Sequence, residues 1–278
     1  TFEPSPSGSR LVVHYDPQGK PLWARKAVFR TISASPQRDG VALVSDEEQP
    51  SPGWGRAARI EVIDSSGATL WKRDINWAIG SAAAMDSTGA VVLVGTAYGR
   101  ADFGQGPLGD PNDRFFFITR VAKGGALMWS RSFPAQYTSD VKLSVNRAGA
   151  IGLLVRISKG SIDFGGGLVD CTDWCWTRYD PSGLHLSSRT THSKNARDIA
   201  VDEQGGTILT GVFSKTINLG GQDLVPKGAA DAYIVRYSST GTHSWSTSFG
   251  GSAAVQASHI SVDRYGAISV LASSARAP

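Results

Sequence analysis

The sequence predicts an all-β fold built from repeated four-stranded antiparallel sheets, and two interleaved motifs carry this prediction. The first motif ends in tryptophan and recurs at Trp23, Trp71, Trp129 and Trp245, with Ser187 in the remaining copy, so its spacings are 48, 58, 58 and 58 residues. The second motif places a polar residue three positions before a glycine and continues in a β-rich run, as in MDSTGAVVLVG at 85 and VDEQGGTILTG at 201. Regular recurrence of both motifs indicates one structural unit repeated along the chain.

Each unit is expected to contain four strands, which we call a, b, c and d. The copy between residues 198 and 248 shows them as DIAVD, TILTGVF, AYIVRY and THSWSTS, with a long loop between b and c. Alternation of apolar and polar residues at period two favours strands over helices. The D-x-x-G segments are typical of tight turns, because Asp accepts bonds from nearby amides and Gly adopts a positive φ.

Four antiparallel strands repeated every 40 to 60 residues or so are typical of a β-propeller, in which each sheet is one blade. The chain begins with a c–d pair (10–26), continues with four a–b–c–d units (about 31–74, 80–132, 139–190 and 196–247) and ends with an a–b pair (257–275). We therefore predict five blades, the last shared between the N- and C-terminal strands, which removes an open sheet edge. Residues 10–278 are expected to form a single propeller domain, preceded by a tether at residues 1–9.

Composition excludes several classes of protein. Of the 278 residues, 41% are hydrophobic and 19% are charged, a balance that supplies a large core and differs from that of a disordered chain. No apolar run approaches the roughly 18 residues of a membrane span, and the first residues lack a signal-peptide pattern, so we expect any targeting segment to have been removed. The net charge of +4 comes from interspersed bases and acids, so no nucleic-acid partner is predicted.

The motifs together resemble a known family. The chain contains YDPQGKPLW at 15, VDEQG at 201, DFGQG at 102 and DFGGG at 163. This combination is similar to the bacterial β-propeller repeat proteins of the SBBP type, and more loosely to PQQ-type propeller repeats. The resemblance covers nearly the whole chain and implies a bacterial propeller that is extracellular, periplasmic or at the cell surface, without assigning an activity. Quinoprotein dehydrogenases with PQQ-type repeats need eight blades and usually an adjacent cysteine pair, and this sequence predicts neither.

The long b–c loops are expected on the face opposite the D-x-x-G turns, and we expect a partner to bind on that face. Asp102, Asp163 and Asn218 recur in these loops. No D-x-D-x-D-G spacing accompanies them, so we interpret them as turn-capping residues rather than calcium ligands, with Phe103 and Phe164 as plugs between blades. No metal and no cofactor is predicted.

The inner strands carry the candidate site, because the narrow axis of a propeller requires small side chains. Two residues before the turn Asp or Asn stand Ala84, Ser144, Ala200 and Ser261, and four residues before it Ser33 and Ala82 are also small. Four residues before it, the rule fails at Lys142, Asp198 and His259, and Asp140 lies one alternation further out. We predict that these four residues meet near one mouth of the channel, either as solvated side chains or as a site for an anionic or polyhydroxylated ligand.

Cys171 and Cys175 are the only cysteines of the chain. An extended strand would hold their Cα atoms ~13 Å apart at ~3.3 Å per residue, beyond the ~7 Å limit for a disulfide. Pairing therefore requires a turn at 172–174, which the end of a b–c loop allows. We predict a disulfide, typical of an oxidising compartment, with packed free thiols as the alternative. No second cysteine pair or nearby histidine completes a zinc site.

Arginines and histidines also recur with the repeat. Arg120, Arg178 and Arg236 stand 58 residues apart on strand c, and Arg25, Arg73, Arg131 and Arg189 each stand two residues past the tryptophan position. We interpret these arginines as partners in ion pairs between blades. His185 and His243, at the start of strand d, are expected on the outer surface.

No enzyme signature is present, since the chain has no G-x-S-x-G elbow, H-E-x-x-H segment, phosphate loop or dinucleotide fingerprint. The first hypothesis is a secreted or surface-anchored binding or scaffold module for a protein or carbohydrate, with no membrane span and with a lipid anchor upstream left open. The second is a propeller glycosidase or a lectin-like glycan-binding protein. A glycosidase would need two carboxylates ~5–10 Å apart, and Asp140 and Asp198 are the candidates. The sequence leaves open whether any catalysis occurs.

Overall fold

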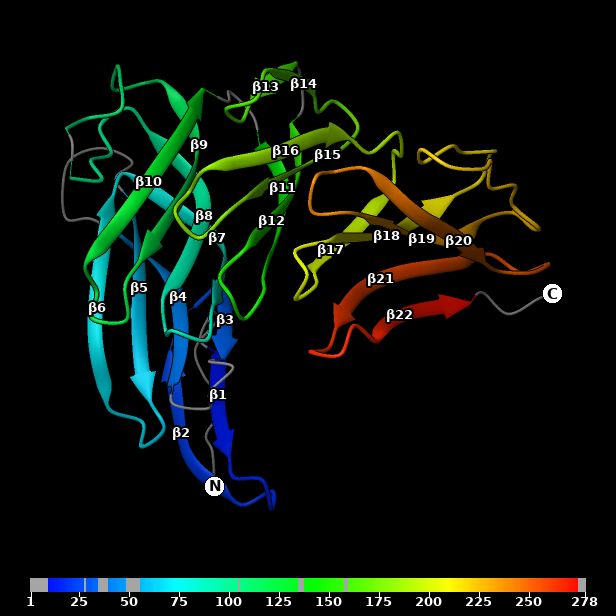
Figure 1. Cartoon of the computed structure of the whole chain (residues 1–278). Coiled ribbons are helices and arrows are strands. Elements are labelled where there is room, and N and C mark those ends of the chain that lie inside the picture. Colours follow the sequence, from blue (N-terminus) through cyan, green and yellow to red (C-terminus); the bar gives the residue numbers. More distant parts are fainter. Residues whose placement is uncertain are drawn as a thin grey trace. The chain divides into compact units, whose positions relative to one another are not determined.

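The computed structural model describes residues 10–27, 29–34, 40–48, 56–104, 106–134, 138–157 and 160–274, and these residues form strands and turns without a helix (Figure 1). No segment among them is a helix long and apolar enough to cross a membrane. The tether predicted at residues 1–9 and the last residue of the predicted terminal pair, Ala275, lie outside the described residues. The chain divides into two compact units, Thr1–Pro134 and Ala135–Pro278, which are described separately.

The first unit contains one two-stranded hairpin and two four-stranded antiparallel sheets. The hairpin pairs β1 (Arg10–Tyr15) with β2 (Pro21–Ala27). The next sheet contains β3 (Thr31–Ala34), β4 (Gly40–Glu48), β5 (Arg56–Asp64) and β6 (Thr69–Asn76), and the third contains β7 (Ala78–Met85), β8 (Val91–Tyr98), β9 (Arg114–Val121) and β10 (Leu127–Pro134). Strands that are consecutive in sequence pair in both sheets, which is the meander of a propeller blade.

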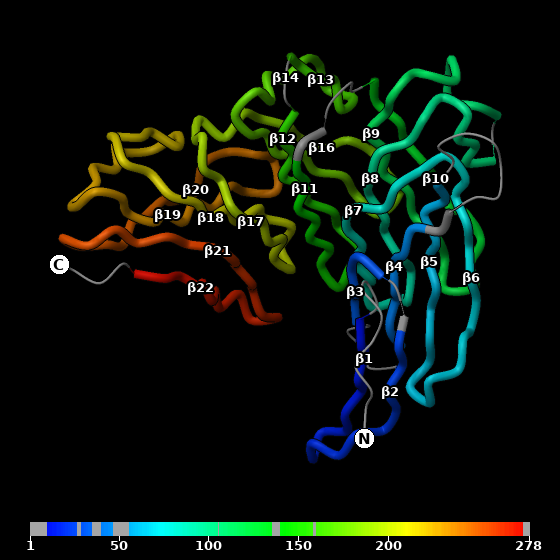
Figure 2. The backbone as a smooth tube through the Cα atoms, turned by 180° about the vertical axis from the view of Figure 1, so that it is seen from behind, coloured from blue at the N-terminus to red at the C-terminus, as the bar shows by residue number. Residues whose placement is uncertain are grey.

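The second unit repeats this pattern. Its first sheet contains β11 (Thr138–Val145), β12 (Ile151–Ile157), β15 (Cys175–Tyr179) and β16 (His185–Thr190), with a small hairpin of β13 (Ser161–Asp163) and β14 (Leu168–Asp170) in the b–c loop. Its second sheet contains β17 (Ala196–Val201), β18 (Thr207–Phe213), β19 (Asp231–Tyr237) and β20 (His243–Phe249). The last hairpin, β21 (Val255–Val262) and β22 (Ile268–Ser274), lies beside β17 and β18, as the trace in Figure 2 shows.

The four whole blades predicted from the repeat are therefore present as four-stranded sheets. The predicted turns form as well. Asp86 Oδ1 accepts a hydrogen bond from Thr88 N (2.8 Å) beside Gly89, and Asp202 Oδ1 accepts one from Gly206 N (2.6 Å). Glycine is favoured at position 89 because the backbone φ there is +81°, a conformation that residues with a side chain rarely adopt. Each terminal hairpin is a two-stranded sheet, so the shared fifth blade and the single domain over residues 10–278 stay predictions.

Apolar side chains between neighbouring sheets form the core. In the first unit, Val44 and Ile60 of one sheet pack with Leu93 and Phe117 of the next, and all four are completely buried. Gly80 permits this approach, because a Cβ there would lie 2.5 Å from Val44 Cγ1. Burial of one such side chain stabilises the fold by about 1.5–3 kcal/mol. In the second unit, the equivalent cluster contains Trp176, Leu209 and Tyr233.

The motif tryptophans fasten successive sheets of the first unit together. Trp23 Nε1 donates to Ser65 O (3.1 Å), and its ring lies so close to Gly67 that a Cβ there would be 3.0 Å from Trp23 Cγ. Trp71 makes the same pair of contacts one blade later, donating to Lys123 O and covering Gly125. In the second unit, Ser187 stands at the position of the motif tryptophan. A Cβ built on Gly241 would lie 3.1 Å from the Cβ of Ser187, so this position again faces the glycine of the next turn. The repeated tryptophan is therefore a structural residue that joins one sheet to the next, and we call this contact the tryptophan fastener.

Two of the three strand-c arginines, Arg120 and Arg236, form ion pairs within their own blade, so the expectation of pairing between blades was wrong for these two. Arg120 pairs with Asp86, and Arg236 Nε donates to Asp202 Oδ2 (2.8 Å). The reason is geometric: strand c lies beside strand b, and its arginine reaches across b to the carboxylate of the a–b turn. Arg178 differs, because Asn146 occupies the turn position of its blade. Its Nη1 donates to Ser239 O (2.6 Å) of the next blade.

His185 and His243 are half-buried, so their expected placement on the outer surface was wrong. Each ring lies beneath the b–c loop of its blade. The loop comes so close to His185 that a Cβ built on Gly166 would lie 2.3 Å from His185 Cε1. The loop folds back along the blade and is held there by a tyrosine of strand c, as Tyr179 Oη donates to Phe164 O (2.9 Å). The glycines of the loop therefore make room for the imidazole.

Candidate functional site

A pocket in the second unit contains three of the four predicted site residues. Its volume is ≈ 340 Å³, and Asp140 and Lys142 of β11 and His259 of β21 line it. Arg197 of β17 and Trp174 of the loop before β15 complete its charged and aromatic lining. We call this cavity, defined by these five residues, the mouth pocket.

The repeat explains why these residues meet. Asp140 and Lys142 are two positions apart on β11, so their side chains project from the same face of the strand. His259 stands at the position on β21 that Lys142 holds on β11, and Arg197 lies at the start of β17. All of these positions precede the D-x-x-G turns by several residues, so the pocket lies toward the opposite ends of the strands. Trp174 belongs to a b–c loop, so one of the long loops contributes to the pocket.

The mouth pocket combines three basic side chains with one acidic side chain. Lys142 Nζ lies 3.4 Å from Asp140 Oδ1, and both side chains are more than 40% exposed, at 41% and 46%. A pair this exposed contributes at most about 1 kcal/mol to stability, so it leaves Lys142 able to change partner. His259 Nδ1 lies 3.1 Å from Ser258 Oγ. The cavity is therefore a polar, solvated site with an excess of hydrogen-bond donors.

Asp198 is not among the described residues that line the mouth pocket, although the sequence placed it there. Its Oδ2 accepts Ile260 N (3.0 Å) and its Oδ1 accepts Ile199 N (2.9 Å), so the carboxylate joins β17 to β21. Burial raises the pKa of Asp198 above its ordinary value, against the lowering effect of the two amide bonds. Ser144 makes a similar bridge one blade earlier, where its Oγ accepts Val201 N (3.0 Å). The carboxylate thus holds neighbouring inner strands together.

The predicted disulfide is formed and shapes one wall of the mouth pocket. Cys171 and Cys175 are bonded with their Cα atoms 4.8 Å apart, and Asp170 Oδ1 caps the required turn by accepting Thr172 N (2.9 Å). Trp174, which lies between the two cysteines, is 6% exposed. Its carbonyl accepts Thr191 N (2.8 Å). Trp174 and Arg197 were missed from the sequence because neither stands at a repeated position, and the placement of Trp174 inside the Cys–Cys segment was the one available signal.

The recurring loop residues are turn caps, as predicted. Asp163 Oδ1 accepts both Gly165 N (2.7 Å) and Gly167 N (2.9 Å), and Asp102 and Asn218 cap equivalent turns. Phe103 and Phe164 are buried beneath these loops as plugs. Within the described ranges, no group of three or more His, Cys, Asp or Glu side chains is placed to hold a metal ion.

Comparison with known proteins finds likeness in solved structures alone. No protein-family model matches the chain, and no curated protein matches it. The Dos1 propeller is 8% identical over 91% of this chain and 54% of its own, with a TM-score of 0.43. A gluconolactonase from Xanthomonas campestris is 13% identical over 94% of this chain and 75% of its own, with a TM-score of 0.44.

The cobalt-substituted apocarotenoid oxygenase of Synechocystis is 12% identical over 88% of this chain and 55% of its own, with a TM-score of 0.45. The chain thus spans about half the length of the Dos1 propeller and of the oxygenase, and three quarters of the gluconolactonase. Likeness at this level assigns neither a family nor an activity to this chain.

Proposed function

We propose that this chain is a non-enzymatic binding module and that its ligand contacts the mouth pocket. One observation supports this proposal above the others: large basic side chains converge where other copies of the repeat carry Ala or Ser. A structural role does not require these side chains, since Ala82 stands at the position of Lys142 in the third sheet. Lys142 and His259, two of the three residues that depart from the repeat there, also share one cavity with the buried Trp174.

The chemistry of the lining favours a carbohydrate or another polyhydroxylated ligand over an apolar one. Lys142 and Arg197 present donors, while Gln256 and Ser258 present groups that both donate and accept. A volume of ≈ 340 Å³ lies at the lower end of the range for small-molecule sites, about 300–1,000 Å³, and suits one or two sugar rings. The positive excess favours a glycan that carries a carboxylate or a sulfate.

The arrangement of carboxylates favours binding over glycoside hydrolysis. A glycosidase needs two carboxyl groups free to reach the scissile bond. Asp140 is paired with Lys142, and both oxygens of Asp198 accept backbone amides. Only Asp140, whose pair with Lys142 is exposed, is therefore open to a ligand, and a glycosidase needs two such carboxyl groups, so glycosidase activity is the second candidate.

We further infer that the two terminal hairpins complete one blade, which makes five. The repeated fastener supports this inference: Trp23 covers Gly67 and Trp71 covers Gly125, each on the c–d turn of the following blade. In a closed ring, the blade that follows β17–β20 would present the turn at Gly19, and Trp245 would cover it. The disulfide supports an oxidising, extracellular or periplasmic location, or the cell surface.

A glycan array of neutral, uronic-acid-containing and sulfated oligosaccharides tests the binding function. The variant Lys142→Ala/Arg197→Ser/His259→Ser should keep the thermal midpoint of the wild type, because it leaves Asp198 and the core intact. It should lose binding to the best array hit by at least about tenfold, or about 1.4 kcal/mol. Lys215→Ala, which removes one exposed charge outside the pocket, is the control. Equal binding by the folded triple variant, or no array signal above that of the triple variant, would contradict the proposal.

A further inference from the structure

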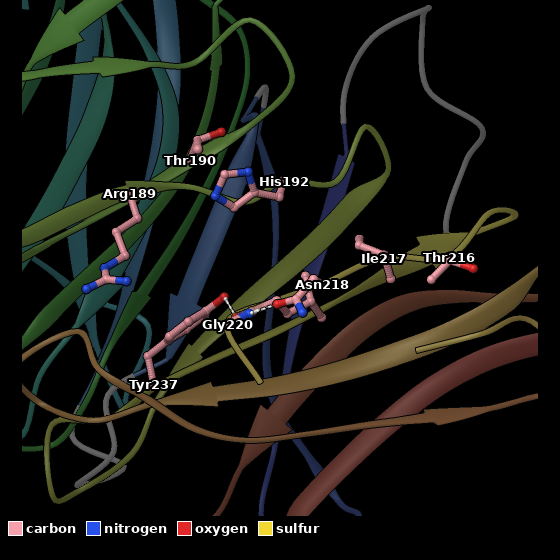
Figure 3. Close-up of a pocket in the computed structure, with 9 residues that line it drawn as sticks. Arg189, Thr190, His192, Thr216, Ile217, Asn218, Gly220 and Tyr237 are labelled. Carbon is pink, nitrogen blue, oxygen red and sulfur yellow. Dashed lines mark hydrogen bonds between the residues drawn. The ribbon is translucent and has the colours of Figure 1, made fainter. Parts of the chain in front are cut away.

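A second cavity of the second unit, drawn in Figure 3, has a volume of ≈ 430 Å³ and shares no lining residue with the mouth pocket. One side is formed by the end of β16 and the connection after it, which contribute Arg189, Thr190 and His192. The other side is formed by the b–c loop that follows β18, including Asn218, and by Tyr237 of β19. We call this cavity, defined by these five residues, the lateral pocket.

The charged side chains that line the lateral pocket are both basic. Arg189 and His192 are exposed, and no described carboxylate lines the cavity. Within the described part of the chain, neither side chain forms a hydrogen bond or an ion pair. Two of the other polar groups are already engaged: Asn218 Oδ1 accepts Gly220 N (2.8 Å), and Tyr237 Oη donates to Leu219 O (2.9 Å). The two bases are not engaged in this way, and Figure 3 draws no dashed line at either of them.

Comparison with other copies of the repeat shows why Arg189 has no partner. In the first unit, Arg25 reaches the next sheet, where its Nη2 lies 2.9 Å from Glu61 Oε1 and its Nη1 donates to Thr69 Oγ1 (3.2 Å). The strand registers place Val235 at the position of Glu61 and His243 at the position of Thr69. The acceptors that hold Arg25 are thus replaced by an aliphatic side chain and by an imidazole that packs under its own loop. The guanidinium of Arg189 is left to face the cavity.

The backbone fixes His192 at the rim of the lateral pocket. Its φ of +52° lies in the left-handed region, which is uncommon for residues other than Gly, although Asn, Asp and His adopt it more often than the rest. The flanking Thr191 and Ser193 are buried, at 1% and 3% exposed, and Thr191 Oγ1 donates to Ser193 O (3.0 Å). A strained conformation persists where its surroundings impose it, and such residues cluster at ligand sites. The connection therefore holds the backbone of His192 at the rim of the cavity.

We propose that the lateral pocket binds an oxyanion, a carboxylate or a sulfate or phosphate ester, carried by a sugar-sized molecule. The planar guanidinium of Arg189 matches two oxygens of such a group, and His192 supplies a second donor. Burial raises the pKa of Tyr237 to about 12, so the phenol is uncharged at neutral pH and does not repel the anion. Ile217 and Tyr237 provide apolar surface for the body of the ligand. This site uses residues that the mouth pocket does not share.

Isothermal titration with defined probes tests the proposal. Glucuronate, glucose 6-sulfate and glucose 6-phosphate should bind the wild-type chain, whereas neutral glucose should not; the three anions distinguish a carboxylate from a sulfate or phosphate ester. Arg189→Gln should weaken the tightest anion by at least about tenfold. His192→Asn should also weaken it while tolerating the left-handed backbone. Both variants should keep the wild-type thermal midpoint, because neither side chain has a partner to lose.

Two control variants make the outcome decisive. Lys215→Gln removes one positive charge from the same loop outside the cavity and should change affinity by less than about twofold, since exposed charges are screened. Lys227→Gln removes an exposed charge that lines neither pocket and should likewise change the affinity for these probes by less than about twofold. Equal weakening by Arg189→Gln and Lys215→Gln would show attraction to overall charge and overturn the proposal. Absence of binding by every anion at about 10 mM would overturn it as well.

Discussion

Asn146→Asp should stabilise the second unit, because it places a carboxylate at the turn of the blade that holds the buried Arg178, where at present only the charge of Asp202 in the next blade acts on the guanidinium. Arg178 is 1% exposed, burial lowers its pKa, and its Nε has no hydrogen-bond partner. In the sister blades, the same turn position holds Asp86 and Asp202, which pair with Arg120 and Arg236. The substitution therefore restores the pair that the repeat uses elsewhere.

The expected gain follows from what the substitution adds and removes. A hydrogen bond to a charged group contributes about 1.5–3 kcal/mol, and Arg178 is already desolvated in the wild type. Asn146 Nδ2 donates to Asp202 O (2.8 Å), and loss of that bond costs about 1 kcal/mol. The turn bond from Ala150 N to Asn146 Oδ1 (2.9 Å) needs an acceptor only, so it survives. The free energy of unfolding should rise by about 0.5–2 kcal/mol.

Urea denaturation followed by tryptophan fluorescence measures this change. Arg178→Met in both backgrounds completes a double-mutant cycle, and Asn146→Asp should destabilise the Arg178→Met chain, where the new carboxylate is buried without a cation. The pKa of the introduced carboxylate should be depressed by the arginine, so its contribution is present above the unfolded value of about 3.9 and is lost as the pH falls below it. If Asn146→Asp lowers stability, or acts equally in the two backgrounds, the pairing argument is wrong.

Three further predictions concern the fastener, the disulfide and an ion pair. Trp71→Ala should lower the free energy of unfolding by at least about 2 kcal/mol, and Trp245→Ala should do the same if the ring closes on Gly19. A loss below about 0.5 kcal/mol for Trp245→Ala would argue against closure. Cys171→Ser/Cys175→Ser should lower the free energy of unfolding by only about 2 kcal/mol, because the closed loop is short. The double variant should also weaken glycan binding, because the disulfide positions Trp174. Intact mass after alkylation without reductant should show no free thiol in the wild type. Burial raises the pKa of Glu61, but the Thr69 hydrogen bond and the charges of Arg25 and Lys72 outweigh it and leave the pKa below 4.5. Stability should therefore be lost as the pH falls through that lowered value, and Glu61→Gln should flatten the fall in an acid titration of the thermal midpoint; an unchanged slope would count against the pair.

Local features of the fold were predictable from the sequence, because the repeat displays each of them several times. The strands, the D-x-x-G turns and the caps at Asp102 and Asp163 depend on residues within a few positions of one another. The partners of Arg120 and the placement of His185 were not predictable in this way. The first depends on which strand of the sheet the arginine crosses, and the second on a loop that folds back along its blade.

The residues of the candidate site also separate into those that the repeat predicts and those that depend on contacts between distant segments. Lys142 and His259 were predicted together because the repeat assigns them one structural position, and the cavity contains both. Asp198 shares that position but turns to the backbone, because amides of its own strand and of β21 lie within reach of its carboxylate. Arg197 and Trp174 stand outside the repeat, and only the packing of the b–c loop against the strand starts reveals them.

Departures from the repeat have different consequences according to where they leave a charge. Asn146 leaves Arg178 in the interior without a carboxylate from its own blade, where an incompletely satisfied guanidinium costs free energy and has no access to a ligand. Val235 leaves Arg189 at an exposed cavity, where water solvates the guanidinium and a ligand can displace that water. The first change weakens the fold without providing a site, whereas the second provides a site with little cost to the fold. In a repeat protein, an arginine that has lost its partner is therefore informative about binding when it is exposed, and about stability when it is buried.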